Sequence, residues 1–242
     1  MPAVDVATLL TVWEEGSSQP PLTRALQLLA AGSGMTQEEW ARVPIGERDA
    51  GLLRLKEEWF GSRLEASEVC PQCGERLEAT FSTLDLQRAS PRSTPGPFEL
   101  NRSGFAVEFR LPTSLDLWES GSSDVPGARE TLLRGCITSA RRGDEPVDPR
   151  TLPEDVLTGV VDQMAEADPM ADMHVELSCA LCGHSWTVAL DITGYLWSEV
   201  EDWAKRLLIE IHTLASAYGW GEAEILALSP NRRRSYLDLL GA

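Results

Sequence analysis

The chain has 242 residues, of which 43% are hydrophobic, and carries a formal net charge of -17 at pH 7. This length fits one compact domain with an insertion, or two small domains, and the hydrophobic content is enough for a sizeable core. Proteins that grip nucleic-acid phosphates or anionic membranes usually carry the opposite charge, so both are disfavoured as partners, whereas an acidic chain suits docking onto a basic protein.

The N-terminal stretch MPAVDVATLL has no basic region and leads into Glu14 and Glu15, unlike a secretory signal peptide. No apolar run approaches the ~18 residues that a membrane-spanning helix needs. We therefore expect a cytoplasmic protein. In that compartment, paired cysteines are more often metal ligands or redox groups than disulfides.

Residues 1–62 are predicted to form a helical N-terminal region. Apolar residues recur at helical spacing in VATLLTVWEEG, in QPPLTRALQLLAAG and from Asp49 to Phe60. A proline pair opens the second of these segments and Gly32 ends it. Thr36 and Glu39 form a capping-box signature, which predicts a further helix starting there.

Four of the five cysteines form two C-x-x-C-G motifs, CPQCG and CALCG. In such a knuckle a tight turn presents two thiolates to one metal ion, and the following glycine adopts a positive φ at little cost. Alternating apolar residues flank the motifs, so each is predicted to be the tip of a β-hairpin, at about 64–86 and 173–193. The four predicted zinc ligands are Cys70, Cys73, Cys179 and Cys182.

Two knuckle hairpins around one metal ion are typical of a zinc ribbon. The usual ribbon has roughly 15–20 residues between its cysteine pairs, whereas about a hundred intervene here, which indicates an inserted segment. A redox-active pair is the alternative, but neither motif opens a helix after a strand. Four thiolates leave no open position, which favours a structural zinc over a catalytic one. His184 is then a neighbour of the site or exposed, and Cys136 is a small buried side chain.

Residues 87–172 are predicted to form that insertion. The segment 87–104 is rich in proline, serine and glycine, which favours a loop. FAVEFRLPTSLDLW begins with alternating apolar residues and predicts a strand. Two helical patterns follow at about 128–141 and 152–167, and a capping box of Thr151 and Glu154 predicts the start of the second.

Residues 194–242 are predicted to form a helical tail. An apolar stripe at steps of three or four residues runs through its first helix, and GWGE at 219–222 interrupts it. Ser229 and Pro230 predict the start of a last helix, PNRRRSYLDLL. Its arginines form either a solvated face or a docking patch, and the aromatic residues near GWGE either pack onto the first helix or bind a partner. The candidate partner-binding residues are Tyr218, Trp220, Arg232, Arg233 and Arg234.

The sequence contains none of the common catalytic signatures: no GxxxxGK[ST] phosphate loop, no HExxH, no GxSxG and no GxGxxG after a strand. Of its three histidines, His174 and His184 flank the second knuckle, and His212 lies in the predicted tail helix. We therefore expect no enzymatic activity, no catalytic residue and no small-molecule substrate.

Several stretches resemble the T-even-type bacteriophage baseplate protein family, which is encoded in the tail clusters of phages and of contractile injection systems. The resemblance is carried by AYGWGEAEILALSP with the arginine run and YLDLL after it, by TRALQLLAAG, and by VPIGERDAGLLRLKEEWFG followed by the first knuckle. It implies a component or assembly factor of the baseplate or hub. Such a protein acts through contacts with other tail proteins and can be incorporated into a phage-like particle.

Together these features predict an α+β fold in one compact unit, with helical N- and C-terminal parts (1–62 and 194–242) around an interrupted four-cysteine zinc ribbon (63–193). The expected function is non-enzymatic and structural, with a structural Zn²⁺. A nucleic-acid-binding zinc-ribbon accessory protein is the alternative, which the knuckles suit and the negative charge opposes. An enzyme with an unrecognised site is the third hypothesis.

Overall fold

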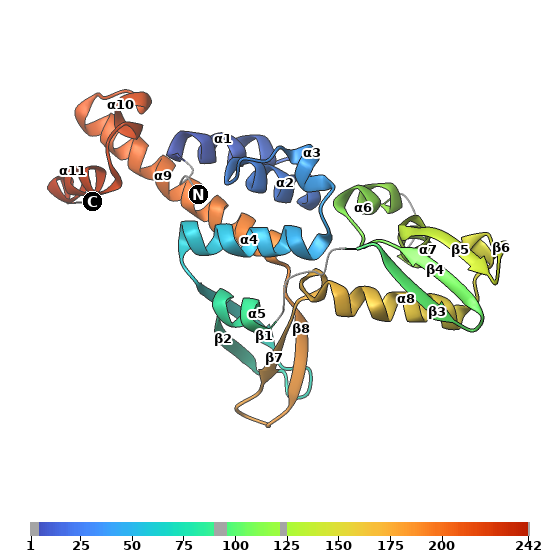
Figure 1. Cartoon of the computed structure of the whole chain (residues 1–242). Helices are drawn as coiled ribbons and strands as arrows, with labels where there is room; N and C mark the ends of the chain where they lie inside the picture. Colours follow the sequence, from blue (N-terminus) through green and yellow to red (C-terminus); the bar gives the residue numbers. More distant parts are fainter. Residues whose placement is uncertain (1–4, 90–95, 122–124, 242) are drawn as a thin grey trace. The chain divides into compact units, whose positions relative to one another are not determined.

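The computed structural model describes residues 5–89, 96–121 and 125–241 (Figure 1). The chain divides into two compact units. Residues 1–34 and 193–242 make up one, the terminal unit, and residues 35–192 make up the other, the middle unit. The fold is α+β, with helices toward both ends of the chain and small antiparallel sheets in the middle unit.

The described part of the terminal unit contains helices and their connections. Asp5 caps its first helix by accepting a hydrogen bond from the Thr8 N–H, and Ser229 caps its last helix by accepting one from the Arg232 N–H. No helix in the described ranges combines the length and hydropathy that a membrane span requires. The helices are α1 (Val6–Gly16), α2 (Pro21–Ala31), α9 (Ile192–Tyr218), α10 (Glu222–Leu226) and α11 (Pro230–Leu240).

The core of the terminal unit lies along one side of α9. Its buried residues follow the spacing of three or four that the sequence predicts for this helix, so the apolar stripe is confirmed. Trp203 and Trp220 pack against the cluster while remaining partly accessible. The buried cluster consists of Leu10, Ala204, Leu207, Ile211, Leu214 and Ile225.

The middle unit begins with helices and then alternates short strands with helices. Thr36 and Glu39 cap the first helix reciprocally, as the sequence predicts. The helices are α3 (Gln37–Ala41), α4 (Ile45–Phe60), α5 (Thr83–Ala89), α6 (Ser114–Ser120), α7 (Val125–Cys136) and α8 (Glu154–Ala167), with 3-10 turns η1 (Pro149–Thr151) and η2 (Pro169–Asp172). The strands are β1 (Arg63–Val69), β2 (Arg76–Ser82), β3 (Phe98–Arg102), β4 (Phe105–Phe109), β5 (Ile137–Arg142), β6 (Glu145–Pro146), β7 (His174–Ser178) and β8 (Ser185–Ala189).

Three antiparallel sheets form in the described part of the middle unit. β1 pairs with β2, and β7 pairs with β8, each as a separate two-stranded hairpin. Between them in the sequence lies a four-stranded sheet in the order β3-β4-β5-β6. Its buried face packs with α8 around Val107, Phe109 and Val156, so the insertion has a core of its own. The two cysteine motifs lie outside this sheet, in the turns that connect β1 to β2 and β7 to β8.

The inserted segment differs from the prediction at four places. The predicted loop 87–104 contains the end of α5 and the strand β3, and the predicted helix at 128–141 ends at Cys136, where β5 takes over. The reason is tertiary: residues after Cys136 pair with β4, and this pairing outweighs the helical pattern of the local sequence. The predicted strand from Phe105 ends at Phe109, and Thr113 then caps α6. Finally, Pro153 rather than Thr151 stands at the start of α8.

Candidate metal centre

The first cysteine motif forms a tight loop at the tip of the β1–β2 hairpin. The Cys70 N–H donates to the Glu75 carbonyl over 2.8 Å, and the Gly74 N–H donates back to the Cys70 carbonyl over 2.9 Å. Gly74 has a φ of 76°, in the left-handed region where residues with a Cβ are strained. The two hydrogen bonds and the glycine fold the backbone so that both thiols lie at the hairpin tip.

The second motif has the same backbone geometry at the tip of the β7–β8 hairpin. The Cys179 N–H donates to the His184 carbonyl over 2.8 Å, and the Gly183 N–H donates to the Cys179 carbonyl over 2.9 Å. Gly183 has a φ of 72°. Two segments far apart in the sequence thus form equivalent knuckles, each at the tip of a β-hairpin as the sequence predicts.

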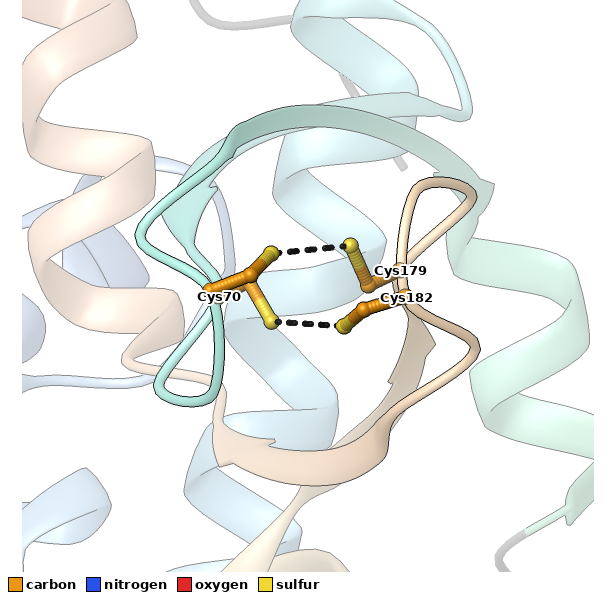
Figure 2. A group of neighbouring side chains, drawn as sticks. Cys70, Cys179 and Cys182 are labelled. Carbon is orange, nitrogen blue, oxygen red and sulfur yellow. Dashed lines mark hydrogen bonds between the residues drawn. The ribbon is translucent and has the colours of Figure 1, made fainter.

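The two knuckles face each other, and their four sulfur atoms gather in one place (Figure 2). Cys70 Sγ lies 3.7 Å from Cys182 Sγ, and Cys73 Sγ lies 3.6 Å from Cys179 Sγ. All four sulfurs lie within 4.8 Å of one another. Zinc–sulfur bonds of about 2.3 Å in a tetrahedron would place sulfurs about 3.8 Å apart. The donor set and its spacing therefore fit one tetrahedral metal ion.

The surroundings of the thiols shift the pKa values of Cys179 and Cys73 in opposite directions. The backbone N–H of Cys182 is the main cause that lowers the pKa of Cys179, to about 7. The backbone N–H of Glu75 also lowers the pKa of Cys73, but burial and the three neighbouring thiols outweigh it and raise that pKa to about 12. Four thiols at this spacing cannot all ionise unless a cation compensates their charge.

A buried lysine holds the base of the first hairpin. Lys56, on the last turn of α4, is almost inaccessible to solvent and donates from Nζ to the carbonyl oxygens of Gly61 and Arg63. The Thr83 N–H donates to the Ser62 carbonyl over 2.9 Å at the other side of the base. Nothing in the sequence pattern points to this role of Lys56, because a lysine near the end of a helix indicates only a favourable interaction with the helix terminus.

His184 and Cys136, which the sequence does not predict to be metal ligands, lie in different surroundings. The His184 ring is half-buried and stacks on Trp186 with a centroid distance of 5.9 Å. Cys136 is fully buried at the end of α7, and burial raises the pKa of its thiol to about 11. In the described residues, Cys136 is thus a buried thiol outside the four-cysteine cluster.

The aromatic candidates for partner binding form a cluster at the end of α9. The rings of Tyr218 and Trp220 stack with a centroid distance of 4.7 Å, and Trp220 meets Tyr236 of α11 edge to face at 4.9 Å. Tyr218 remains 37% exposed, whereas Trp220 is partly buried against the terminal core. The cluster both joins α11 to α9 and exposes one aromatic side chain.

The arginine candidates are divided between core and surface. Arg233 is 4% exposed and donates from Nε to Glu210 on α9 over 3.2 Å and from Nη1 to the Leu228 carbonyl over 2.9 Å. Arg232 and Arg234 are exposed. Partner binding therefore stays a prediction for Arg232 and Arg234, whereas Arg233 has an intramolecular role that helical spacing alone did not indicate.

This division predicts different effects of three alanine substitutions. Arg233→Ala should lower the free energy of unfolding by about 2 kcal/mol, because it removes a charge-assisted pair and leaves the Leu228 carbonyl without its donor. Arg232→Ala and Arg234→Ala should change it by less than about 0.5 kcal/mol, as surface substitutions do. Urea unfolding followed by circular dichroism measures all three, and equal effects would contradict the structural role of Arg233.

A family model described as "T4 bacteriophage base plate protein" matches residues 7–195, a range that includes both knuckles and the inserted segment. No curated protein and no solved structure matches the chain.

Proposed function

The chain belongs to the T4 bacteriophage base plate protein family, and we propose that it is a non-enzymatic component or assembly factor of the baseplate or hub of a contractile phage-tail-like injection system. Family membership supports a baseplate-related structural role with other tail proteins as partners. The proposal adds a structural zinc ion that holds the two knuckle hairpins together.

The observation that carries the proposal is the convergence of four thiols from two equivalent knuckles. Cys70, Cys73, Cys179 and Cys182 would hold the ion, which supplies the positive charge that permits all four to ionise. Backbone N–H groups directed at the sulfurs support the thiolate form, as the pKa of Cys179 illustrates. The four ligands would leave no position for substrate, which supports a structural role. The proposed architecture is thus a zinc ribbon interrupted by residues 87–172.

Contacts with tail proteins would use the exposed part of the terminal unit. Tyr218 presents an aromatic side chain at the surface, and Arg232 and Arg234 present unburied charges on α11. Aromatic and arginine side chains are enriched among residues that dominate the binding energy of protein interfaces. The terminal unit would therefore carry the partner contacts, and the metal would keep the middle unit folded.

Elemental analysis of freshly purified full-length protein tests the metal proposal. We expect one zinc ion per chain and no iron, with the mass of the native species measured on the same sample. Iron in place of zinc would overturn the structural-zinc assignment, because tetrahedral sulfur sites suit both metals. An absence of metal with disulfide-linked cysteines would overturn the metal site altogether. Retention by baseplate and hub proteins co-expressed from the same tail cluster tests the baseplate role separately.

A further inference from the structure

The outer edge of β2 is a free sheet edge with a defined pattern of outward backbone groups. In the described part of the chain, β2 pairs with β1 alone. The bonds from Cys70 to Glu75 and from Thr83 to Ser62 fix which residues face inward. Because inward and outward groups alternate along an antiparallel strand, Arg76 and Glu78 direct their N–H and C=O groups away from β1. These two residues could therefore hydrogen-bond a further strand.

A groove runs beside this edge. It has a volume of about 470 Å³ and is lined by the four consecutive residues from Glu75 to Glu78 together with Ala180 and Leu181 of the second knuckle. Successive side chains of a strand point to opposite faces, so a groove that touches four in a row lies at the strand edge. Leu181 is 71% exposed, an unusual position for a large aliphatic side chain. The groove thus combines unpaired backbone groups with an exposed apolar side chain.

The charges along the edge are complementary to a second copy of the same edge. Arg76 and Glu78 are exposed on one face of β2, and neither forms an ion pair in the described residues. Across the hairpin they lie opposite Val69 and Ser67, which are uncharged. If two copies of β2 pair antiparallel about Leu77, Arg76 of each copy faces Glu78 of the other. Opposite charges directly across an antiparallel pair stabilise it, and equal charges destabilise it.

We propose that the protein self-associates through this edge, with β2 of one chain pairing antiparallel to β2 of a second copy about a two-fold axis at Leu77. The register places the paired backbone groups of Arg76 and Glu78 within the groove, where Leu181 of each copy covers the partner strand. Such an interface is isologous, since the same patch is used on both sides. It is also short, so the affinity between the two copies should be low. This inference goes beyond the proposed baseplate function and does not depend on it.

Sedimentation equilibrium of the full-length chain with its metal retained tests the proposal. The chain should form dimers in the micromolar to millimolar range. Arg76→Glu and Glu78→Arg should each weaken dimerisation at least about tenfold, because each places two pairs of equal charges across the axis. The double variant R76E/E78R should dimerise to within about threefold of the original chain, because it restores both opposite-charge pairs.

Mixing the two single variants gives the sharpest comparison. The R76E chain has glutamate at both positions and the E78R chain has arginine at both, so the mixture should form a heterodimer although neither variant self-associates. Metal content and circular dichroism of every variant separate lost pairing from lost folding. A monomeric original chain at millimolar concentration would overturn the proposal. Single variants that dimerise as strongly as the original chain would overturn it as well. A mixture of the two single variants that stays monomeric would overturn the antiparallel register. If the groove instead binds a strand of another protein, the original chain should stay monomeric.

Discussion

Replacing Cys70 or Cys179 with serine should abolish stoichiometric metal binding and unfold the middle unit, whereas Cys136→Ser should leave the metal in place. Each of the first two substitutions removes one of four thiolates from the cluster in which all sulfurs lie within 4.8 Å of one another. Structural zinc sites in small domains contribute on the order of 10 kcal/mol or more, which equals or exceeds the stability of a typical domain, about 5–15 kcal/mol. Losing the ion should therefore cost more than the middle unit can offset.

Cys136 is the matched control because it is equally buried and also a thiol. Serine at this position buries a hydroxyl in the place of a small apolar group, which costs about 1–3 kcal/mol. The measurement is zinc per chain together with the thermal unfolding midpoint of each variant. Three variants that melt at the same temperature would contradict the metal-bridged knuckles, as would full zinc retention in the Cys70→Ser chain.

Lys56→Met should destabilise the protein by about 3 kcal/mol. Methionine can fill the volume of the lysine stem, but it cannot donate to the Gly61 and Arg63 carbonyls. Leaving these two partly buried carbonyls without a donor costs about 1–3 kcal/mol each at most. The loss falls at the base of the first hairpin, so the zinc affinity should decrease as well. Urea unfolding and competition with a chelator measure the two effects.

Arg54→Met is the control for this substitution. Arg54 lies on the same helix but is exposed, so its replacement should change the free energy of unfolding by less than about 0.5 kcal/mol. If Lys56→Met is as stable as Arg54→Met, the ammonium group of Lys56 has no anchoring role.

The sequence predicts the candidate site better than it predicts the inserted segment. Two C-x-x-C-G motifs determine their own backbone geometry through local hydrogen bonds and a glycine, so local reasoning reaches both knuckles. Their meeting in space depends on the rest of the middle unit, and only the chemistry of four thiols indicates it in advance. The helical pattern at 128–141, by contrast, gives way after Cys136 because β4 offers hydrogen bonds from a distant segment.

The roles of Lys56 and Arg233 show where such reasoning ends. Both are charged residues on helices, which a sequence pattern assigns to solvent, and both are buried with specific acceptors. Their burial follows from where neighbouring carbonyls and carboxylates lie, and these positions exist only once the helices have packed. A residue-by-residue pattern contains no such information.

The wide separation of the two knuckles along the chain has a consequence for how much the protein can vary. Cys73 and Cys179 are 106 positions apart, yet their sulfurs lie 3.6 Å from each other. The segment between them has its own sheet, helix and core. The entropic cost of closing a loop rises by only about 0.6 kcal/mol for each doubling of its length. Lengthening or shortening this segment at its loops should therefore be tolerated in evolution and in engineering. Its two ends must still meet at the knuckle hairpins, and its buried contacts with α4 through Ser114 and Asp168 must be kept.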